Sequence, residues 1–191
     1  MIKAVIFDFF GVIITTDPYK EWLQQHIADI RTRKAEFQGI SDRGDRGEIT
    51  FDQFIDEVAQ KAGVSREETL RMNEETYPNY PLIDYIKELR QQGYKIGIIS
   101  NTTEDWIYFL LSLHGLYEYF DQITVSSTLG VIKPQPGIFT HTLSALGVAP
   151  HEAVYTDDRE VHVQAARSLK IHSFLFKDAA QFRKQLLSVQ S

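Results

Sequence analysis

The sequence has no cysteine, no long hydrophobic run and no excess of basic residues, and each absence excludes a class of protein. Without cysteine, the chain forms no disulfide framework and carries out no thiolate chemistry. The formal net charge is −6 and the isoelectric point is about 5.5, which argues against nucleic acid or an anionic membrane surface as a partner. No apolar stretch is long enough to span a bilayer.

The apolar run near the amino terminus does not have the pattern of a secretion signal. It covers residues 2–14, is interrupted by Asp8 and lacks a small-residue cleavage site. We therefore expect a cytoplasmic protein. The 191 residues suit one domain, or a core with a modest insertion, and a hydrophobic content of 43% is ample for a packed core.

Apolar runs that alternate with helical patterns predict an open α/β fold. The first run, residues 2–14, indicates a strand that is buried on both faces, as in parallel sheets. Four later runs behave in the same way: 94–100, 122–126, 153–156 and 171–176. Helical spacing follows each strand or precedes it, over 81–92, 103–114, 136–146, 159–169 and 179–188. This alternation predicts parallel strands joined by right-handed crossovers.

Residues 15–80 interrupt the alternation, because they contain only helical patterns. We expect helices over about 18–37, 50–62 and 65–76, with capping-box residues at the start of the last two. The glycine-containing stretch 39–47 predicts a turn-rich loop between helices. An all-helical insertion directly after the first strand would lie over the carboxyl edge of the sheet, where ligands bind in open α/β folds. We expect it to act as a lid.

Residues with chemical potential gather at that same edge. Asp8 stands in an apolar run, where a carboxylate without partners would be costly, and Gly11 allows the chain to turn out of the sheet. The other candidates are Ser100 with Asn101, Lys133 in a proline-rich loop, and Asp157 with Asp158. Each also has a structural interpretation, as a strand-end turn, a helix cap or a solvated lysine. Two adjacent carboxylates nevertheless exceed what one cap needs, and they repel each other without a cation.

Taken together, these residue types suit phosphoryl transfer. Three carboxylates can hold a hard cation such as Mg²⁺ through oxygen ligands. A hydroxyl group, backbone amides and a lysine can hold phosphate oxygens. A carboxylate at a strand end can attack phosphorus to form an aspartyl-phosphate, while the lysine and the metal stabilise the charge of the transition state.

The chain resembles the haloacid dehalogenase superfamily over nearly its whole length. The resemblance rests on four motifs in the expected order: Phe7-Asp8-Phe9-Phe10-Gly11-Val12, Ser100-Asn101, Lys133-Pro134, and Thr156-Asp157-Asp158 with Ala165-Ala166 downstream. It implies a Rossmann-like parallel core made of residues 1–14 and 81–191, with a small all-helical cap over residues 15–80. Most members of the superfamily are Mg²⁺-dependent phosphatases of small phosphorylated metabolites.

The resemblance also implies roles for the matching residues. Asp8 would be the nucleophile. Ser100 and Asn101 would bind the phosphoryl group, and Lys133 would anchor it and balance the carboxylates.

The resemblance further implies a set of metal ligands. The Mg²⁺ ion would bind the carboxylates of Asp8 and Asp158 and the backbone carbonyl of Phe10. Asp157 would act on the metal directly or through water.

Phe10 departs from the family pattern. Phosphatases of the superfamily usually carry a second aspartate two residues after the nucleophile, where it serves as general acid and base. Such catalysis is worth about 10²–10⁴-fold, or about 3–5 kcal/mol of barrier. We therefore expect slow hydrolysis where the leaving group is a poor alkoxide, and a smaller penalty for acyl and aryl phosphates.

His162 and Lys170 also differ from the family pattern, since many relatives have Asn and Gly at these positions. His162 either lies beside the metal site or is a surface helix histidine.

Three functions remain open from the sequence. We expect a hydrolase, namely a Mg²⁺-dependent phosphatase weakened by Phe10. A non-catalytic protein that binds a phosphorylated ligand or a partner is the alternative. A 2-haloacid dehalogenase would carry a tyrosine at the Phe10 position, but it would lack the paired acids at 157 and 158.

Arg43 and Arg46 either reach an anionic substrate from the insertion or are solvated. Exposed aromatic side chains near 103–114 could serve a homodimer.

Overall fold

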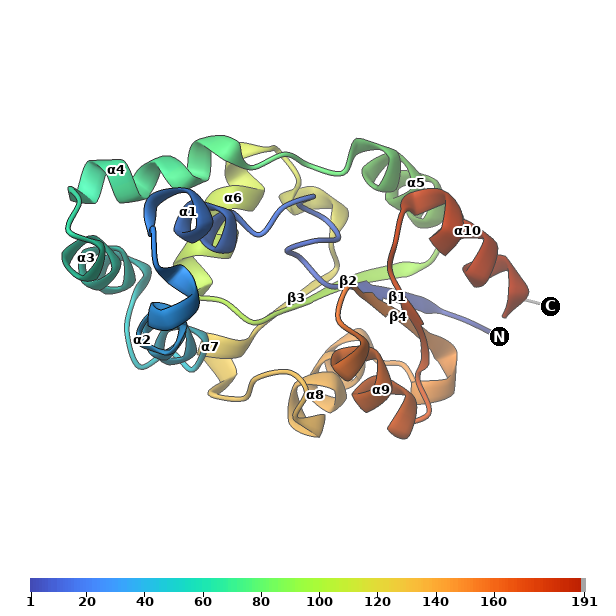
Figure 1. Cartoon of the computed structure of the whole chain (residues 1–191). Helices are drawn as coiled ribbons and strands as arrows, with labels where there is room; N and C mark the ends of the chain where they lie inside the picture. The colour runs from blue at the N-terminus through green and yellow to red at the C-terminus, as the bar shows by residue number, and fades with distance from the viewer. Residues whose placement is uncertain (190–191) are drawn as a thin grey trace.

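In the computed structural model, which describes residues 1–189 apart from the side chain of Glu75, five parallel strands form one sheet in the order β3-β2-β1-β4-β5 (Figure 1). The strands are β1 (Ala4–Phe7), β2 (Lys95–Ser100), β3 (Gln122–Val125), β4 (Ala153–Asp157) and β5 (His172–Leu175). Every residue of β1 and β4 is buried, which explains why both segments are almost continuously apolar. The predicted α/β fold with a parallel sheet is confirmed.

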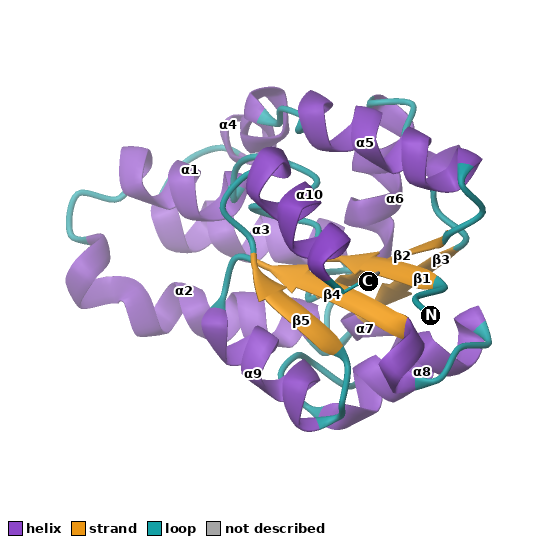
Figure 2. Cartoon of the chain, turned by 90° about the vertical axis from the view of Figure 1, so that its right-hand side faces the viewer, coloured by secondary structure: helices purple, strands orange, loops and turns teal. Residues whose placement is uncertain are grey.

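Helices cover both faces of the sheet (Figure 2). One face carries α5 (Tyr80–Gln91), α6 (Glu104–Leu113) and α10 (Ala179–Ser188), and the other carries α7 (Ser126–Leu129), α8 (Pro136–Leu146) and α9 (Glu160–Ser168). Two short 3-10 helices, η2 (Tyr117–Tyr119) and η3 (Pro150–Glu152), precede β3 and β4. Local signals set the ends of α8, because Pro136 suits a first helical turn and Gly147 ends the helix in a left-handed conformation. The five predicted helices of this part of the chain agree with the structure to within one residue at each end.

A group of helices, called the helical insertion below, separates β1 from α5 and lies beyond the carboxyl ends of the strands (Figure 1). It consists of α1 (Pro18–His26), α2 (Ile30–Asp45), α3 (Phe51–Ala62), α4 (Arg66–Leu70) and the 3-10 helix η1 (Arg71–Glu75). The predicted helix over 18–37 is wrong in its extent, because the chain is extended at the buried residue Ile27 and a second helix starts at Ile30. The helix predicted over 65–76 changes to 3-10 geometry after Leu70.

The predicted loop over 39–47 is also wrong, because α2 continues to Asp45. Gly44 is buried within this helix and allows close packing: a Cβ atom there would lie 3.3 Å from Cγ2 of Thr103. Of the three glycines in this stretch, only Gly47 has a positive φ, of 73°, so the turn starts after the helix.

Aromatic and polar contacts hold the helical insertion against the rest of the molecule. The ring of Phe51 stacks on Trp106, with 5.0 Å between the centroids. The carboxylate of Asp105 accepts a hydrogen bond of 3.1 Å from the amide of Phe51. At Gly47 the backbones approach so closely that a Cβ atom would lie 2.3 Å from the carbonyl oxygen of Ser127.

The strand order creates a switch point at β1, which pairs with β2 on one side and with β4 on the other. The chain builds outward from β1 through β2 to β3 and then returns to form β4 and β5. Open α/β sheets bind ligands at such a point, outside the carboxyl ends of the strands. Asp8, Ser100 and Asp157 stand at the ends of β1, β2 and β4.

Among the helices that the structure describes, none has the length and apolar character needed to cross a membrane.

Candidate active site

Asp8, the first residue after β1, belongs to a buried ion network. Nζ of Lys133 lies 2.6 Å from Oδ1 of Asp8 and 2.9 Å from Oδ2 of Asp157, and it donates a hydrogen bond of 3.0 Å to the carbonyl of Ile99. All three charged residues are at least 94% buried, since Asp8 is 6% exposed, Lys133 3% and Asp157 0%. One ammonium group therefore joins carboxyl groups from two adjacent strands, and the network has an excess negative charge only when both carboxyl groups are ionised.

The shared ammonium group sets the ionisation of the network. Burial raises the pKa of Asp8 well above its ordinary value; the positive charge of Lys133 opposes this effect and the negative charge of Asp157 adds to it. Burial would also raise the pKa of Asp157, but Lys133 and His162 outweigh it and hold this pKa well below its ordinary value. Burial disfavours the charged form of Lys133, yet the two carboxylates raise its pKa. Asp157 and Lys133 thus form the stable charged pair.

Hydrogen-bond donors surround Asp157. The hydroxyl of Tyr155 donates to its carboxylate, as does the amide of Arg159 at 2.8 Å. Nδ1 of His162 lies 2.9 Å from Oδ2, and because an ionised carboxylate only accepts, this nitrogen carries the proton. His162 is 2% exposed, so its interpretation as a surface histidine is wrong, and burial lowers its pKa. Asp157 is thus held by donors on several sides and pairs with Lys133.

Asp158 is exposed and lines the cavity in front of the network. A Cβ atom at Gly11 would lie 2.6 Å from Oδ2 of Asp158, and Gly11 has a φ of 80°. The missing side chain therefore lets this carboxylate lie over the turn that follows Asp8. Burial and the charge of Asp157 raise the pKa of Asp158. Carboxylate and carbonyl oxygens at this turn form the kind of donor set that a hard divalent cation prefers.

A second group of possible ligands fits a metal less well. The ligand atoms of Asp8, Asp157 and His162 lie within 4.8 Å of one another. However, the ammonium group of Lys133 already lies between the two carboxylates, and the ring nitrogen of His162 that faces Asp157 carries a proton. This space is occupied by a cation that the protein itself supplies.

Ser100 and Asn101, at the end of β2, have different surroundings. The hydroxyl of Ser100 is 1% exposed and has no hydrogen-bond partner among the described residues. The side chain of Asn101 is already used: Nδ2 donates to the carbonyl of Lys133 at 3.1 Å, and Oδ1 accepts from the amide of Lys133 at 2.8 Å. Asn101 thus fixes the loop that carries Lys133, next to the cis peptide bond between Lys133 and Pro134.

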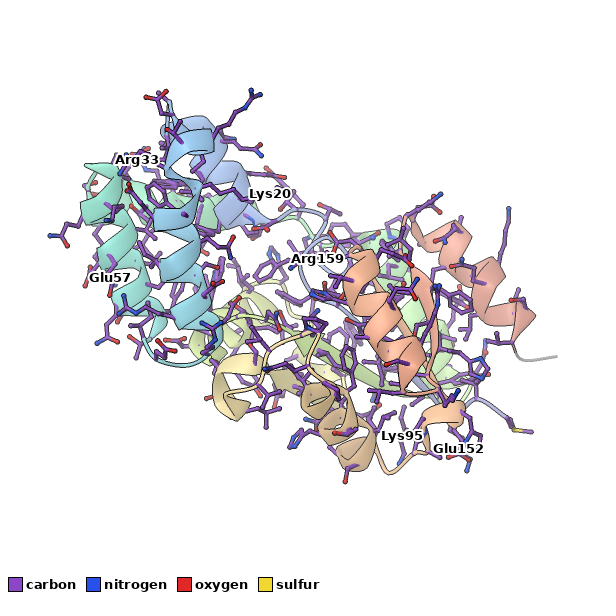
Figure 3. All side chains as sticks on the ribbon, turned by 60° about the horizontal axis from the view of Figure 1, so that its bottom comes forward. Lys20, Arg33, Glu57, Lys95, Glu152 and Arg159 are labelled. Atoms are coloured by element: carbon purple, nitrogen blue, oxygen red, sulfur yellow. The ribbon has the colours of Figure 1, made fainter. Side chains whose placement is uncertain are left out.

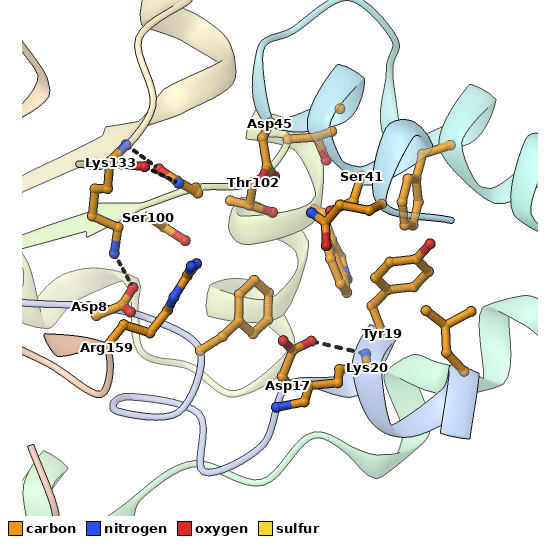
Figure 4. Close-up of a pocket in the computed structure, with 18 of the residues that line it drawn as sticks. Asp8, Asp17, Tyr19, Lys20, Ser41, Asp45, Ser100, Thr102, Lys133 and Arg159 are labelled. Carbon is orange, nitrogen blue, oxygen red and sulfur yellow. Dashed lines mark hydrogen bonds and ion pairs between the residues drawn. The ribbon is translucent and has the colours of Figure 1, made fainter. Parts of the chain in front are cut away.

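The cavity has a volume of about 720 Å³ and lies between the sheet edge and the helical insertion. Figure 4 shows Asp8, Ser100 and Lys133 on the side of the sheet, and Tyr19 and Asp45 on the side of the insertion. Its volume is in the range of typical small-molecule sites.

The ring of Phe10 forms part of the cavity wall. It lies 4.9 Å from Trp106 and 5.0 Å from Phe9, measured between ring centroids. The position two residues after Asp8 therefore presents an aromatic surface with no exchangeable proton.

Arg43 and Arg46 are not among the residues that line this cavity. Arg43 forms two hydrogen bonds with the carboxylate of Glu57, of 2.7 and 3.0 Å, which join α2 to α3. Arg46 is exposed just after α2. Other cations line the cavity instead: Lys20, Arg31, Lys34 and Arg159. Lys20 extends from the insertion and Arg159 from the start of α9, on the two sides of the opening (Figure 3).

Sequence reasoning missed several residues of the site. The glycine-containing stretch predicts a loop at Asp45, although the spacing of the buried residues Phe37, Ile40 and Gly44 is helical and extends α2 to it. Arg159 directly follows the paired acids. Tyr155, two residues before Asp157 on β4, points to the same side of the sheet by strand alternation.

Known proteins resemble this chain in sequence and in fold. The family model described as haloacid dehalogenase-like hydrolase matches residues 2–170. A D-ribitol-5-phosphate phosphatase of Bacteroides thetaiotaomicron is 28% identical over 203 residues, which cover 97% of each chain. A crystal structure of a haloacid dehalogenase family enzyme from Bacteroides thetaiotaomicron has a TM-score of 0.80 and 24% identity, over 97% of this chain and 98% of that one. The wild-type form of the latter enzyme in complex with magnesium and inorganic phosphate has a TM-score of 0.74 and 25% identity, over 93% and 96% of the two chains.

Proposed function

Because this chain belongs to the haloacid dehalogenase-like hydrolases, we propose that it is a Mg²⁺-dependent phosphatase of small phosphorylated metabolites that works through an aspartyl-phosphate on Asp8. The main support is the buried network of Asp8, Lys133 and Asp157, which stands at the switch point of the sheet beside an unpartnered serine hydroxyl. A carboxylate held in this way at the edge of a cavity is suited to attack phosphorus.

The contacts of Asp8 indicate which oxygen attacks. Oδ1 accepts from Nζ of Lys133 and, at 2.6 Å, from the amide of Phe9, so we assign Oδ2 as the attacking atom. Ser100 and Lys133 would hold oxygens of the transferring group, since the serine hydroxyl has no other partner and the ammonium group adjoins the nucleophile. Asn101 would contribute by fixing Lys133.

The donor set at the turn after β1 fits Mg²⁺. The carboxylates of Asp8 and Asp158 and the backbone carbonyl of Phe10 would hold the ion, and the absent side chain of Gly11 lets Asp158 approach this turn. The oxygens of Asp157 already accept several hydrogen bonds, so this residue would act through water. When bound, the ion would neutralise charge on the phosphoryl oxygens.

We further propose that residues 15–80 form a cap on a core made of residues 1–14 and 81–191, and that the cap selects the substrate. The cavity lining from the insertion includes hydroxyl, amide and carboxyl groups, at Ser41, Gln38 and Asp45. Such groups suit a leaving group that carries hydroxyls. D-Ribitol 5-phosphate, the substrate in the name of the relative from Bacteroides thetaiotaomicron, is therefore the first compound to assay.

The test of this function is hydrolysis of acetyl phosphate and para-nitrophenyl phosphate, with Mg²⁺ and with a chelator. We expect turnover that requires Mg²⁺ and that falls below detection in Asp8→Asn. Asp84→Asn is the matched control, because Asp84 is exposed on α5 and pairs only with Lys87 among the described residues. Hydrolysis by Asp8→Asn at the wild-type rate would show that the nucleophile is assigned wrongly.

Phe10 favours one alternative function, the binding of a phosphorylated ligand or partner without turnover. In that case the native chain would hydrolyse neither compound, whereas Phe10→Asp would gain activity because the rest of the site is intact. A dehalogenase would instead release halide from a 2-haloacid in the presence of the chelator.

A further inference from the structure

The proposed phosphatase reaction lacks a proton donor at the usual place. When Asp8 displaces an alkoxide, that oxygen needs a proton, and the side chain of Phe10 has none to give. In an in-line displacement the leaving oxygen departs on the side opposite to the nucleophile. Asp8 lies on the sheet side of the cavity, so the departing oxygen faces the helical insertion (Figure 4).

Several titratable groups line the cavity, but most are already in use. The hydroxyl of Tyr19 donates to the carbonyl of Phe37 at 3.0 Å, and burial raises its pKa. Asp17 accepts from the amide of Lys20 at 3.1 Å and caps α1. The Nδ1 proton of His162 is donated to Asp157, and Asp158 belongs to the proposed metal site.

Asp45 is different, because no hydrogen bond or ion pair holds its carboxyl group within the described part of the chain. It is half-buried and lines the cavity from the insertion side. Packing of Gly44 against Thr103 brings it to the end of β2, where the hydroxyl of Thr102 is 2% exposed and also has no partner among the described residues. The carboxyl of Asp45 on the leaving-group side, and the buried hydroxyl of Thr102 at the end of β2, thus both lack a hydrogen-bond partner among the described residues.

The position of Asp45 is unfavourable for stability. It is the last residue of α2, where the helix dipole disfavours a negative charge, and Asp42 lies one turn earlier on the same helix. Burial is the largest cause that raises the pKa of Asp45, and the negative charges of Asp42 and Asp17 add to it. The positive charges of Lys133 and Arg159 lower this pKa, and the resulting pKa is about 7. A carboxyl group that is protonated near neutral pH suits a general acid, and residues that oppose stability in this way are typical of functional sites.

We propose that Asp45 is the general acid and base of this enzyme and replaces the side chain that is missing at Phe10; the proposal rests on the phosphatase function above. In the first step an oxygen of Asp8 bonds to phosphorus, the bond from phosphorus to the ester oxygen breaks, and that oxygen takes the proton of Asp45 to leave as an alcohol. In the second step water attacks the aspartyl-phosphate and gives a proton to the Asp45 carboxylate. The bond from phosphorus to Asp8 breaks, and inorganic phosphate leaves.

The test compares leaving groups in Asp45→Asn, which keeps the shape of the side chain but cannot act as an acid. kcat/KM reports the first step, so we measure it for D-ribitol 5-phosphate and glycerol 3-phosphate, which have poor leaving groups, and for para-nitrophenyl phosphate. We expect a loss of about 10²–10⁴-fold for the alkyl phosphates and of less than about 10-fold for the aryl phosphate. The wild-type value for alkyl phosphates should fall above pH 7, and this decline should be absent in Asp45→Asn.

Two further variants sharpen the comparison. Asp84→Asn is the control, because Asp84 is exposed on α5, does not line the cavity and is not among the charged groups that shift the pKa of Asp45; it should keep the wild-type ratio between substrates. Phe10→Asp in the Asp45→Asn background should restore most of the lost activity on alkyl phosphates. Equal losses on alkyl and aryl phosphates in Asp45→Asn would overturn the proposal. So would a wild-type enzyme that hydrolyses para-nitrophenyl phosphate but neither alkyl phosphate, although its phosphatase function would then stand.

A measurement without turnover is independent of both the metal and the substrate. The carboxyl carbon of Asp45, followed by ¹³C NMR in metal-free wild-type protein, should titrate with a midpoint near 7. A midpoint near 4, the ordinary value of an aspartate, would remove Asp45 as a proton donor at neutral pH.

Discussion

Lys133 determines the balance of charge in the buried network. Its ammonium group contacts both Asp8 and Asp157. Among the described residues, the only other group that can place a positive charge this close to either carboxylate is the ring of His162, when it is protonated. A buried carboxylate that loses its cation remains both desolvated and unpaired. The residue is therefore as important for the folded state as for binding phosphate.

Lys133→Met tests this role, because methionine fills much of the same space without the charge. We expect the free energy of unfolding at pH 7 to fall by about 3–5 kcal/mol, since two buried carboxylates lose their partner. Denaturant titration followed by circular dichroism measures the change. Lys87→Met is the control, because Lys87 pairs with Asp84 at the surface and such a pair contributes at most about 1 kcal/mol. Equal losses in both variants would contradict the account.

At the level of elements, the strands were predictable because burial on both faces leaves a simple pattern. β1 and β4 contain no exposed residue, so their segments are almost continuously apolar up to the acids Asp8 and Asp157. The α2 helix was not predictable in the same way. Gly39 and Gly44 suggested a turn, and the reason for a glycine at position 44 is the contact with Thr103, which is 59 residues away in the sequence.

The candidate site was predictable to the extent that it depends on strand ends. Asp8, Ser100 and Asp157 each follow an apolar run, and parallel strands bring such positions to one edge. The role of Asn101 depends instead on its partner in space, the backbone of Lys133, and no local pattern encodes that contact. The same holds for Asp45, which approaches the site only through the packing of the insertion.

The end of α9 offers a prediction at this scale. Lys170 follows the helix with a φ of 67°, and it is the one residue other than glycine with a positive φ in the described chain. This conformation costs a residue with a Cβ atom about 1–2 kcal/mol. Lys170→Gly should therefore raise the free energy of unfolding by about 0.5–1 kcal/mol and the Tm by about 1–4 °C, after the greater flexibility of glycine in the unfolded chain is subtracted.

Differential scanning calorimetry can measure this gain. Lys170→Ala is the matched control, because it removes the same charge and aliphatic stem but keeps the Cβ atom that causes the strain. An equal gain in both variants would attribute the effect to the lysine side chain rather than to the backbone.

At the scale of the whole molecule, the helical insertion and the sheet share one hydrophobic core. A continuous cluster of buried side chains includes Phe37 and Phe54 of the insertion together with Trp106 and Val5. The insertion is therefore expected to unfold together with the sheet. A proton donor on α2 would make the chemistry depend on the packing of the insertion against the sheet, because the nucleophile and the acid come from opposite sides of the cavity.

The homodimer remains a prediction. It would form at Phe109 and the other exposed apolar residues on and after α6.

The unusual ionisation of Asp45 should make the stability of the whole protein depend on pH. Its pKa is about 7 in the folded state and about 4 in the unfolded chain, so between these values the folded state binds more protons. The contribution of Asp45 to the free energy of unfolding then decreases as pH rises from 4 to 7 and does not recover above 7. Burial is the largest cause of this raised pKa, and the charged groups that face Asp45 modify it: Asp42 and Asp17 raise it, whereas Lys133 and Arg159 lower it.

Asp45→Asn removes this dependence, because the amide is neutral at every pH. We expect the variant to be more stable than the wild type by about 1–3 kcal/mol at pH 8. This gain is smaller than the full pKa difference between the folded and unfolded states implies, because the side chain is partly exposed to water. Most of the gain should disappear at pH 4.5, where the wild-type carboxyl is protonated in the folded state. Urea titrations of both proteins at the two pH values measure the difference, with Asp84→Asn as the control, because Asp84 is not among the groups that shift the pKa of Asp45. A gain of the same size at both pH values would mean that ionisation of Asp45 does not oppose folding, and the residue would then lose its explanation as a destabilising group kept for catalysis.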